Sequence, residues 1–136
     1  MKVLITGGKG QLGTDLQDVL GAKSIDFLAL DVDAADITDR EGFRKVATEY
    51  APDVIVHCAA YTAVDKAEEQ LDIVRKINVD GTLNVALAAK ELHAKMVYIS
   101  TDYVFPGTGE NFYEVDDKPD PISAYGETKY EGELEV

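Results

Sequence analysis

The sequence predicts an α/β fold in which a doubly wound parallel sheet carries helices on both faces. Three observations predict it. Four short, nearly continuous apolar runs have the length of buried strands, the segments between them carry apolar residues at helical spacing, and a glycine-rich turn joins the first run to the first helical segment. Strands that alternate with helices in this way form parallel sheets with right-handed crossovers.

The strands are predicted at residues 2–6, 25–30, 53–58 and 95–100, and a short fifth strand is predicted at residues 35–38. Between the strands, apolar side chains recur three and four residues apart, which places one apolar stripe on each of three helices. The stripes comprise Leu12, Leu16 and Val19; then Phe43, Val46 and Tyr50; then Val74, Ile77, Gly81, Val85, Ala88 and Leu92. A last helix is predicted to begin after Ser123, a suitable N-cap.

The composition indicates one domain in a reducing compartment. The chain has 136 residues, a formal net charge of −13 and a single cysteine, Cys58, which excludes a disulfide scaffold. Its apolar runs are shorter than the roughly 20 residues that span a bilayer, and its start lacks the pattern of a secretory signal. We therefore expect a cytoplasmic protein, and its acidity argues against nucleic acid or an anionic membrane as a partner.

The acidic charge is concentrated near the end of the chain. Residues 101–136 contain 10 acidic and 2 basic residues and three of the four prolines, which favours a long exposed loop before the last helix. No strand follows that helix, and its final turn has two glutamates and no basic residue. We therefore expect residues 1–136 to be a single, incomplete domain, truncated before the last strands of the sheet.

A glycine-rich turn follows the first strand, where residues 6–13 read TGGKGQLG. Its glycines fit both G-x-G-x-x-G and G-x-x-G-x-x-G. In either register glycine permits a sharp turn and lets a pyrophosphate approach the backbone N–H groups at the helix N-terminus. A flexible surface turn is the alternative. The preceding strand, the following helix and Asp31, 18 residues after Gly13, favour a dinucleotide site of the Rossmann type.

The cofactor that this turn predicts is NADH or NADPH. Asp31 ends the second strand, where it is positioned to accept hydrogen bonds from the adenosine ribose hydroxyls and to repel a 2′-phosphate, which favours NADH. Lys9 lies in the turn and would partly offset that repulsion, although a solvated surface lysine is an equally good interpretation. The charges favour NADH and leave NADPH open.

Small side chains follow the third strand. Ala59, Ala60 and Tyr61 are predicted to form a second wall of the cofactor site, because ligands bind at the carboxyl ends of such strands. Close packing of strand and helix is the alternative. No metal site is predicted, because the adjacent His57 and Cys58 have no second Cys/His cluster to complete one. We interpret His57 as a strand residue satisfied by hydrogen bonds.

Tyr125 and Lys129 are four residues apart on the last predicted helix, so their side chains lie one above the other. The lysine charge is expected to lower the pKa of the phenol, which can then give its proton to a carbonyl oxygen while hydride reaches the carbon. Thr101, at the end of the fourth strand, is predicted to donate a second hydrogen bond to that oxygen. Such a pair is common on solvated helices, but together with a dinucleotide turn it predicts a reductase.

Four segments together resemble the extended class of short-chain dehydrogenase/reductases, namely residues 7–13, 59–65, 100–105 and 125–129. Within that class, the runs TGGKGQLG, AAYTAVDKAE and STDYVF are similar to the dTDP-4-dehydrorhamnose reductase family, and the resemblance covers essentially the whole chain. It implies that NADPH or NADH reduces the 4-keto group of a nucleotide-sugar substrate, dTDP-4-dehydro-L-rhamnose, to give dTDP-L-rhamnose.

The resemblance also implies roles for individual residues. The family's catalytic triad matches Thr101, Tyr125 and Lys129. Its cofactor contacts match Gly7, Gly10, Gln11, Leu12, Asp31, Ala59, Ala60, Tyr61 and Lys129. Asn78 matches an asparagine that some relatives use in a proton relay, with helix packing as the alternative.

Family members continue into further strands and a smaller lobe that holds the nucleotide-sugar. We therefore expect a cofactor-binding half, as a fragment of a longer enzyme or covered by a partner chain, with a sheet edge exposed to homo-oligomerisation or strand exchange. Two other functions stay open. One is an extended-class epimerase or dehydratase, which differs in the motif at residues 100–105, and the other is a non-catalytic dinucleotide-binding regulatory subunit.

Overall fold

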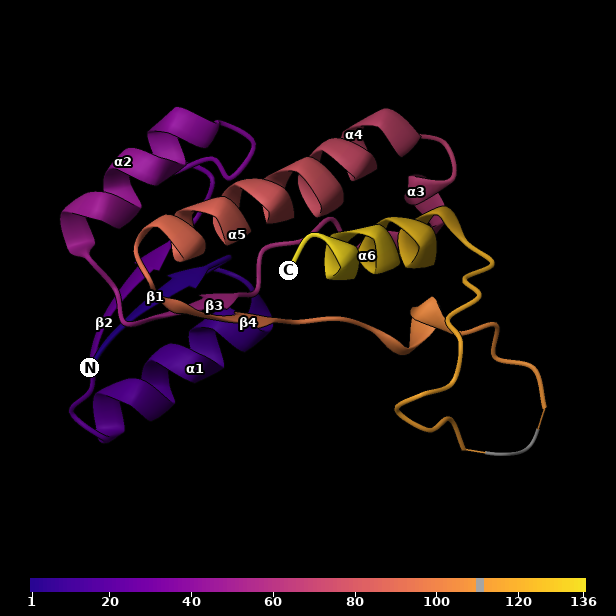
Figure 1. Ribbon diagram of the computed structural model, residues 1–136, viewed down its shortest axis with the longest axis horizontal. Helices are drawn as coiled ribbons and strands as arrows, with labels where there is room; N and C mark the ends of the chain where they lie inside the picture. Colours follow the sequence, from indigo (N-terminus) through magenta and orange to yellow (C-terminus); the bar gives the residue numbers. More distant parts are fainter. Residues whose placement is uncertain (110–111) are drawn as a thin grey trace.

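The computed structural model describes residues 1–109 and 112–136 and contains a parallel sheet with helices on both faces (Figure 1). The strands are β1 (Lys2–Thr6), β2 (Asp26–Leu30), β3 (Val54–His57) and β4 (Lys95–Tyr98), in the spatial order β2-β1-β3-β4. All three neighbouring pairs are parallel, which confirms the predicted fold class. Each of these strands lies within its predicted range.

The helices follow the predicted alternation with the strands. They are α1 (Gln11–Ala22), α2 (Arg40–Tyr50), α3 (Val64–Ala67), α4 (Leu71–Arg75), η1 (Lys76–Gly81), α5 (Thr82–Glu91), η2 (Asp102–Val104) and α6 (Ala124–Leu134). Helix α1 lies on one face of the sheet, whereas α2 and α5 lie on the other (Figure 1). Within the described residues, no helix has both the length and the apolar character needed to cross a bilayer.

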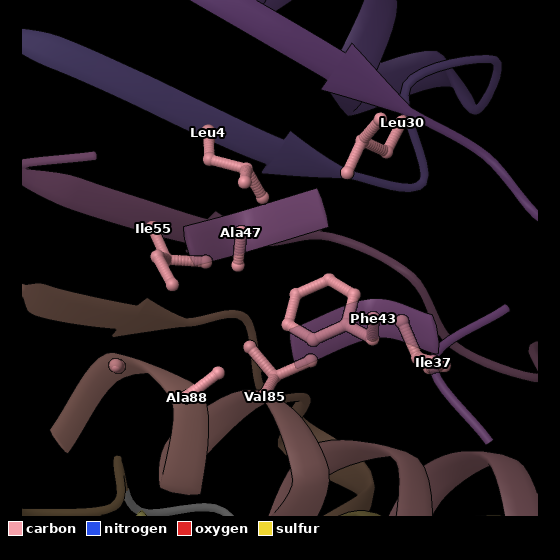
Figure 2. Close-up of a cluster of buried hydrophobic side chains, with 9 residues drawn as sticks. Leu4, Leu30, Ile37, Phe43, Ala47, Ile55, Val85 and Ala88 are labelled. Atoms are coloured by element: carbon pink, nitrogen blue, oxygen red, sulfur yellow. The ribbon is translucent and has the colours of Figure 1, made fainter. Parts of the chain in front are cut away.

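The main core lies between the sheet and the helices α2 and α5. Leu4 and Ile55 point from β1 and β3 towards Phe43 of α2 and Val85 of α5, and all four side chains are fully buried (Figure 2). Because side chains alternate along a strand, the neighbours of Leu4 face the opposite side, where Val3 and Ile5 pack with Leu20 of α1. The sheet is therefore packed on both faces, as its apolar strands predicted.

The fifth strand predicted at residues 35–38 is wrong. The Ala35 N–H donates to the Asp31 carbonyl at 2.9 Å, and the Asp36 carboxylate accepts hydrogen bonds from both the N–H and the hydroxyl of Thr38 at 2.8 Å. These local bonds satisfy the backbone in turns and compete with strand pairing. Ile37 is buried in the main core all the same, so the apolar signal marked a core residue rather than a strand.

The apolar stripe predicted for α1 is also wrong in part. Leu12 and Val19 are 46% and 50% exposed, and the buried positions of the helix are Gly13 and Leu20, with Leu16 half-buried beside them. The glycine, which carries no hydrophobic side chain, is what allows this face to approach the turn after β1. The stripes predicted for α2 and for the long third helix are confirmed, since their members are buried or half-buried.

The long third helix is interrupted by the π-helical segment η1. Its apolar stripe passes from Ile77 to Gly81 to Val85 in two consecutive steps of four residues. The stripe stays on the buried side through the π-helical segment, where Gly81 and the following Val85 are both buried. Such segments often occur at functional sites.

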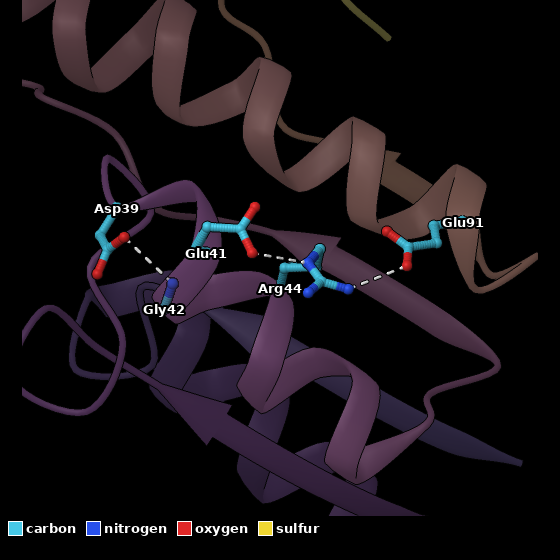
Figure 3. A network of polar contacts seen from close by, with 5 residues as sticks. All are labelled: Asp39, Glu41, Gly42, Arg44 and Glu91. Carbon is cyan, nitrogen blue, oxygen red and sulfur yellow. Dashed lines mark hydrogen bonds and ion pairs between the residues drawn. The ribbon is translucent and has the colours of Figure 1, made fainter.

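Polar contacts tie α2 to its neighbours at the surface. The Gly42 N–H donates to the Asp39 carboxylate at 3.1 Å, which caps α2, and Arg44 pairs with Glu41 and with Glu91 of α5, each at 3.2 Å (Figure 3). Exposed ion pairs of this kind contribute at most about 1 kcal/mol each. The α2–α5 arrangement is therefore held mainly by the apolar core beneath them.

The described residues between η2 and α6 form the long loop that the composition predicted. Residues 105–109 and 112–122 contain no helix or strand and are mostly exposed. Helix α6 then begins after Ser123, whose Oγ accepts a hydrogen bond from the Gly126 N–H at 3.1 Å. The predicted N-cap is confirmed.

Candidate dinucleotide and active site

A cleft of about 960 Å³ lies at the carboxyl ends of the strands. β1 and β3 are neighbours, but α1 leads from β1 to one side of the sheet whereas the helices after β3 lead to the other. A parallel sheet forms a crevice where its connections diverge in this way. The predicted residues that line the cleft are Gly7, Gly10, Gln11, Leu12, Asp31, Ala59, Ala60, Tyr125 and Lys129.

The glycine-rich turn forms one side of this cleft. Gly7 has a φ of +69°, and a Cβ there would lie 2.7 Å from the backbone nitrogen of Ala59. A Cβ on Gly13 would collide with the carbonyl oxygen of Gly7. Both positions therefore require glycine, one for its left-handed backbone and both for close approach. Gly10, the N-cap of α1, has no side chain to satisfy the first N–H groups of the helix, which are suited to bind an anion.

The opposite wall depends on a chain of buried hydrogen bonds. The Ala59 N–H donates to the Thr6 hydroxyl at 3.3 Å, Thr6 Oγ1 lies 2.6 Å from His57 Nδ1, and His57 Nε2 lies 3.1 Å from Thr82 Oγ1. Burial, assisted by the charge of Lys129, lowers the pKa of His57 to about 3, so the ring is neutral at pH 7. His57 is thus satisfied by hydrogen bonds, as interpreted from the sequence, and it positions Thr6 under Ala59.

Asn78 of η1 joins this wall to α6. Its side chain accepts the Tyr61 N–H at 2.8 Å, and its amide donates to the Tyr61 carbonyl at 3.3 Å and to the Thr128 hydroxyl at 3.2 Å. Asn78 is 1% exposed, which favours the packing alternative. The Tyr61 hydroxyl donates to Gln70 at 2.8 Å, and Tyr61 lies outside the set of described residues that line the cleft. Ala59 and Ala60 therefore line the cleft, whereas Tyr61 does not belong to its described lining.

Helix α6 brings Tyr125 and Lys129 into the cleft. Both side chains are buried, and the Lys129 ammonium donates to the Ile99 carbonyl at 2.7 Å. Burial lowers the pKa of Lys129 to about 8, an effect that the nearby Glu133 carboxylate partly opposes. Lys129 therefore carries its charge at pH 7 and is half deprotonated at about pH 8. The rings of Tyr125 and Tyr103 pack edge to face, with their centroids 5.5 Å apart.

Thr101 lies beside the cleft rather than in it. Its hydroxyl accepts the Tyr103 N–H at 3.3 Å, which caps η2, and donates to the Asp102 carboxylate at 3.2 Å. The residues just before it, Ile99 and Ser100, line the cleft, whereas Thr101 is outside the described residues that do so. The structure thus brings together the predicted tyrosine and lysine but leaves the threonine hydroxyl engaged locally.

The cleft also contains residues that the sequence did not indicate. Lys76, Ile73 and Ile77 reach it from the long helix, and Asp36 from the turns after β2. Ile73 and Lys76 lie off the apolar stripe, and Asp36 lies in a segment predicted as a strand. Ile77 is on the stripe, where its spacing predicted a core residue, so periodicity carried no signal that these residues face the cleft. Within residues 1–109 and 112–136, no group of three or more His, Cys, Asp or Glu side chains is placed to hold a metal ion.

Comparison with known proteins places the whole chain in one family. The family described as RmlD substrate binding domain matches residues 1–136. The chain belongs to the RmlD substrate binding domain family. The matched residues therefore include the glycine-rich turn and the helix that carries Tyr125 and Lys129.

Several relatives of this RmlD family chain are dTDP-4-dehydrorhamnose reductases. The one from Mycolicibacterium smegmatis is 40% identical over 99% of this chain and 41% of its own length. The crystal structure of the Clostridium acetobutylicum reductase is 47% identical, with a TM-score of 0.97, over 100% of this chain and 49% of that one. The resemblance seen in the sequence is confirmed, and the chain spans about half the length of the relatives it matches.

Two further structures bear on the cofactor. The Bacillus anthracis dTDP-4-dehydrorhamnose reductase, solved in complex with NADP, is 45% identical with a TM-score of 0.96, over 99% of this chain and 48% of that one. The Thermus thermophilus UDP-glucose 4-epimerase, solved in complex with NAD, is 28% identical with a TM-score of 0.89, over 98% of this chain and 49% of that one. The fold is shared by both enzymes, and the higher identity lies with the reductase.

Proposed function

We propose that residues 1–136 are the dinucleotide-binding domain of an NAD(P)H-dependent reductase that converts dTDP-4-dehydro-L-rhamnose to dTDP-L-rhamnose. One observation carries the proposal: Tyr125 and Lys129 line the same cleft as the glycine-rich turn. A proton donor and a dinucleotide site that share a crevice are what carbonyl reduction needs, because proton and hydride must reach the two ends of one C=O bond.

The residues of the cleft fit a dinucleotide. Gly7 and Gly13 leave space that a Cβ would fill, and the uncapped start of α1 offers N–H groups to a pyrophosphate. Asp31, Ala59 and Ala60 line the cleft. Asp31 would accept hydrogen bonds from the hydroxyls of the adenosine ribose, and the two alanines would form the wall beside the cofactor. The cleft volume of about 960 Å³ lies at the upper end of the range for ligand sites.

The chemical step assigns one task to each side chain. When bound, the reduced dinucleotide supplies the hydride. Tyr125 gives its hydroxyl proton to the carbonyl oxygen, and the Lys129 ammonium, held by the Ile99 carbonyl, supplies the positive charge beside it. Thr101 donates a second hydrogen bond to that oxygen, a role for which its hydroxyl must turn away from Asp102.

The relatives support this reaction over the first alternative. The three reductases named above share 40%, 45% and 47% identity with this chain, against 28% for the epimerase. The STDYVF run that carried the resemblance follows β4, beside the cleft. A non-catalytic dinucleotide-binding subunit is the second alternative. Placement of Tyr125 and Lys129 in the cleft favours the enzyme.

Two measurements test the proposal. Titration of the purified chain with NADH and NADPH is expected to show saturable binding of at least one of them. If neither dinucleotide binds, the proposed function is overturned. Oxidation of the reduced dinucleotide by the full-length reductase, on addition of a dTDP-linked 4-keto sugar, then separates the enzyme from the binder. Saturable binding by the chain combined with no sugar-dependent oxidation by the full-length protein would favour the non-catalytic subunit.

Location and self-association are further parts of the proposal. A cytoplasmic location is supported by Cys58 being the single cysteine of the sequence, which suits a reducing compartment. Self-association through the edge of β4 is supported by its position at the end of the strand order and by Val97, which is 38% exposed. Sedimentation of the chain as a monomer at high concentration would contradict such association.

A further inference from the structure

The end of the cleft that would receive the adenosine ribose carries a fixed negative charge. Asp31 Oδ2 accepts the Lys9 N–H and Asp31 Oδ1 accepts the Val32 N–H, both at 2.9 Å. Two backbone donors thus hold the carboxylate in one orientation. Each of its oxygens keeps a lone pair that can accept a ribose hydroxyl.

The one basic side chain of the glycine-rich turn, Lys9, is already paired. The Lys9 ammonium lies 2.7 Å from Asp33 Oδ2, and this hydrogen bond raises the pKa of Lys9 and lowers the pKa of Asp33. Both groups are therefore charged at neutral pH. Lys9 is the one basic residue in the segments 7–13 and 31–38 of the sequence. One ammonium against the carboxylates of Asp31 and Asp33 leaves this end of the cleft with a net negative charge.

We propose that Asp33 is a specificity-determining residue that acts through Lys9: by holding the ammonium, it makes the cleft prefer NADH to NADPH. The inference rests on the proposed function, since it concerns the same dinucleotide site. A 2′-phosphate carries close to two negative charges and would lie beside Asp31. It is accepted only if a cation turns towards it, and Lys9 can do so only when Asp33 releases it.

This assignment differs from one based on Asp31 alone. Asp31 lines the cleft and would contact the adenosine ribose of either dinucleotide. Asp33 pairs with Lys9 instead and is not among the described residues that line the cleft. Removal of the Asp33 charge should therefore leave the NADH contacts in place and change the environment of the 2′-position. Both partners of the pair are well exposed, so its loss should have little effect on folding.

The test compares the affinity of the chain for NADH and NADPH in the wild type, Asp33→Asn and Asp18→Asn. Asp18 is an exposed acid of α1 outside the cleft, so its variant makes the same change in net charge at a distance. The wild type is expected to bind NADH about tenfold more tightly than NADPH, and Asp33→Asn to gain about five- to tenfold for NADPH with NADH within about twofold. Asp18→Asn is expected to leave the ratio as in the wild type.

A second substitution assigns the gain to the lysine. Lys9→Met in the Asp33→Asn background is expected to remove the gain for NADPH, and 0.5 M salt should reduce it as well, since exposed charges are screened. Equal affinity of the wild type for the two dinucleotides, an unchanged ratio in Asp33→Asn, or a gain that survives Lys9→Met would each overturn the inference while leaving the proposed function standing. Failure of the wild type to bind either dinucleotide would overturn both.

Discussion

The Lys129 ammonium lies 4.1 Å from the centroid of the Tyr98 ring, and the Tyr98 hydroxyl donates to the Lys129 carbonyl at 3.0 Å. The two residues come from β4 and α6, so each positions the other across the junction of strand and helix. A cation over an aromatic face is stabilised by the ring, most strongly where water is excluded. Lys129 is almost fully buried, and burial lowers its pKa to about 8, an effect that the Glu133 carboxylate opposes, so the ammonium is charged at pH 7.

The charge of Lys129 should be lost as the pH rises through about 8. With its pKa lowered to about 8, the ammonium is protonated below that pH and neutral above it. Proton donation that needs this charge should therefore decline as the pH rises through about 8. An NMR titration of the lysine side chains measures the pKa directly. Tyr98→Leu, which removes the ring, is expected to lower it further, whereas Tyr98→Phe keeps the ring and should lie closer to the wild type. A wild-type pKa near the ordinary 10.5 would contradict this account.

Tyr125→Phe should remove activity without removing cofactor binding. The substitution deletes one hydroxyl from a buried ring and keeps its packing against Tyr103. In the full-length reductase we expect sugar-dependent oxidation of the reduced dinucleotide to fall about 100-fold or more, with dinucleotide affinity within about twofold. Tyr130→Phe is the matched control, because Tyr130 is on the same helix but outside the described lining of the cleft. Activity of Tyr125→Phe close to that of the control would show that the proton comes from elsewhere.

Gly13→Ala should weaken both the fold and the dinucleotide site. A Cβ at this position meets the Gly7 carbonyl, so the turn or the helix must shift, at a cost of about 1–3 kcal/mol in the free energy of unfolding. Gly21→Ala offers a control in the same helix, because a Cβ there has no neighbour within 4 Å. It is expected to stabilise the chain by about 0.5–1 kcal/mol. Chemical denaturation and dinucleotide titration measure the two effects, and equal stabilities would refute the packing argument.

His57 should make the fold sensitive to acid. Its pKa in the folded chain is about 3, below the 6.5 of an unfolded histidine, so the unfolded chain binds the proton first as the pH falls. Below about pH 6.5 the free energy of unfolding should therefore fall by about 1.4 kcal/mol per pH unit from this residue alone.

Denaturation of the wild type and His57→Asn between pH 6 and pH 4 measures that contribution. The variant should show a shallower pH dependence by about the same 1.4 kcal/mol per unit, whatever its absolute stability. His93→Asn is the control, because His93 is exposed and its left-handed backbone suits asparagine. If the wild type and His57→Asn have parallel pH profiles, the buried neutral histidine is not the source.

Two sequence predictions illustrate the limit of local patterns. The run at residues 35–38 has a buried isoleucine, yet the Asp36 side chain captures the backbone that a strand would need to pair. Tyr61 is predicted to belong to the cofactor wall because it follows Ala59 and Ala60 in the sequence. In the structure its hydroxyl donates to Gln70 and its backbone N–H donates to Asn78. In both cases hydrogen bonds to a polar side chain determined the local structure. Hydropathy patterns do not show which polar groups are close enough to form such bonds.

The sequence by itself determined the strands, the glycine turn and the start of α6, because apolar runs, positive φ at Gly7 and the Ser123 cap act within a few residues of the chain. Only the tertiary structure decided which side chains share the cleft. His57 meets Thr6 across 51 residues of sequence, and Lys129 meets the Ile99 carbonyl across 30. Such contacts depend on how the strands and helices pack. A short stretch of sequence restricts its own backbone angles, but it does not fix the distance between groups that are far apart along the chain.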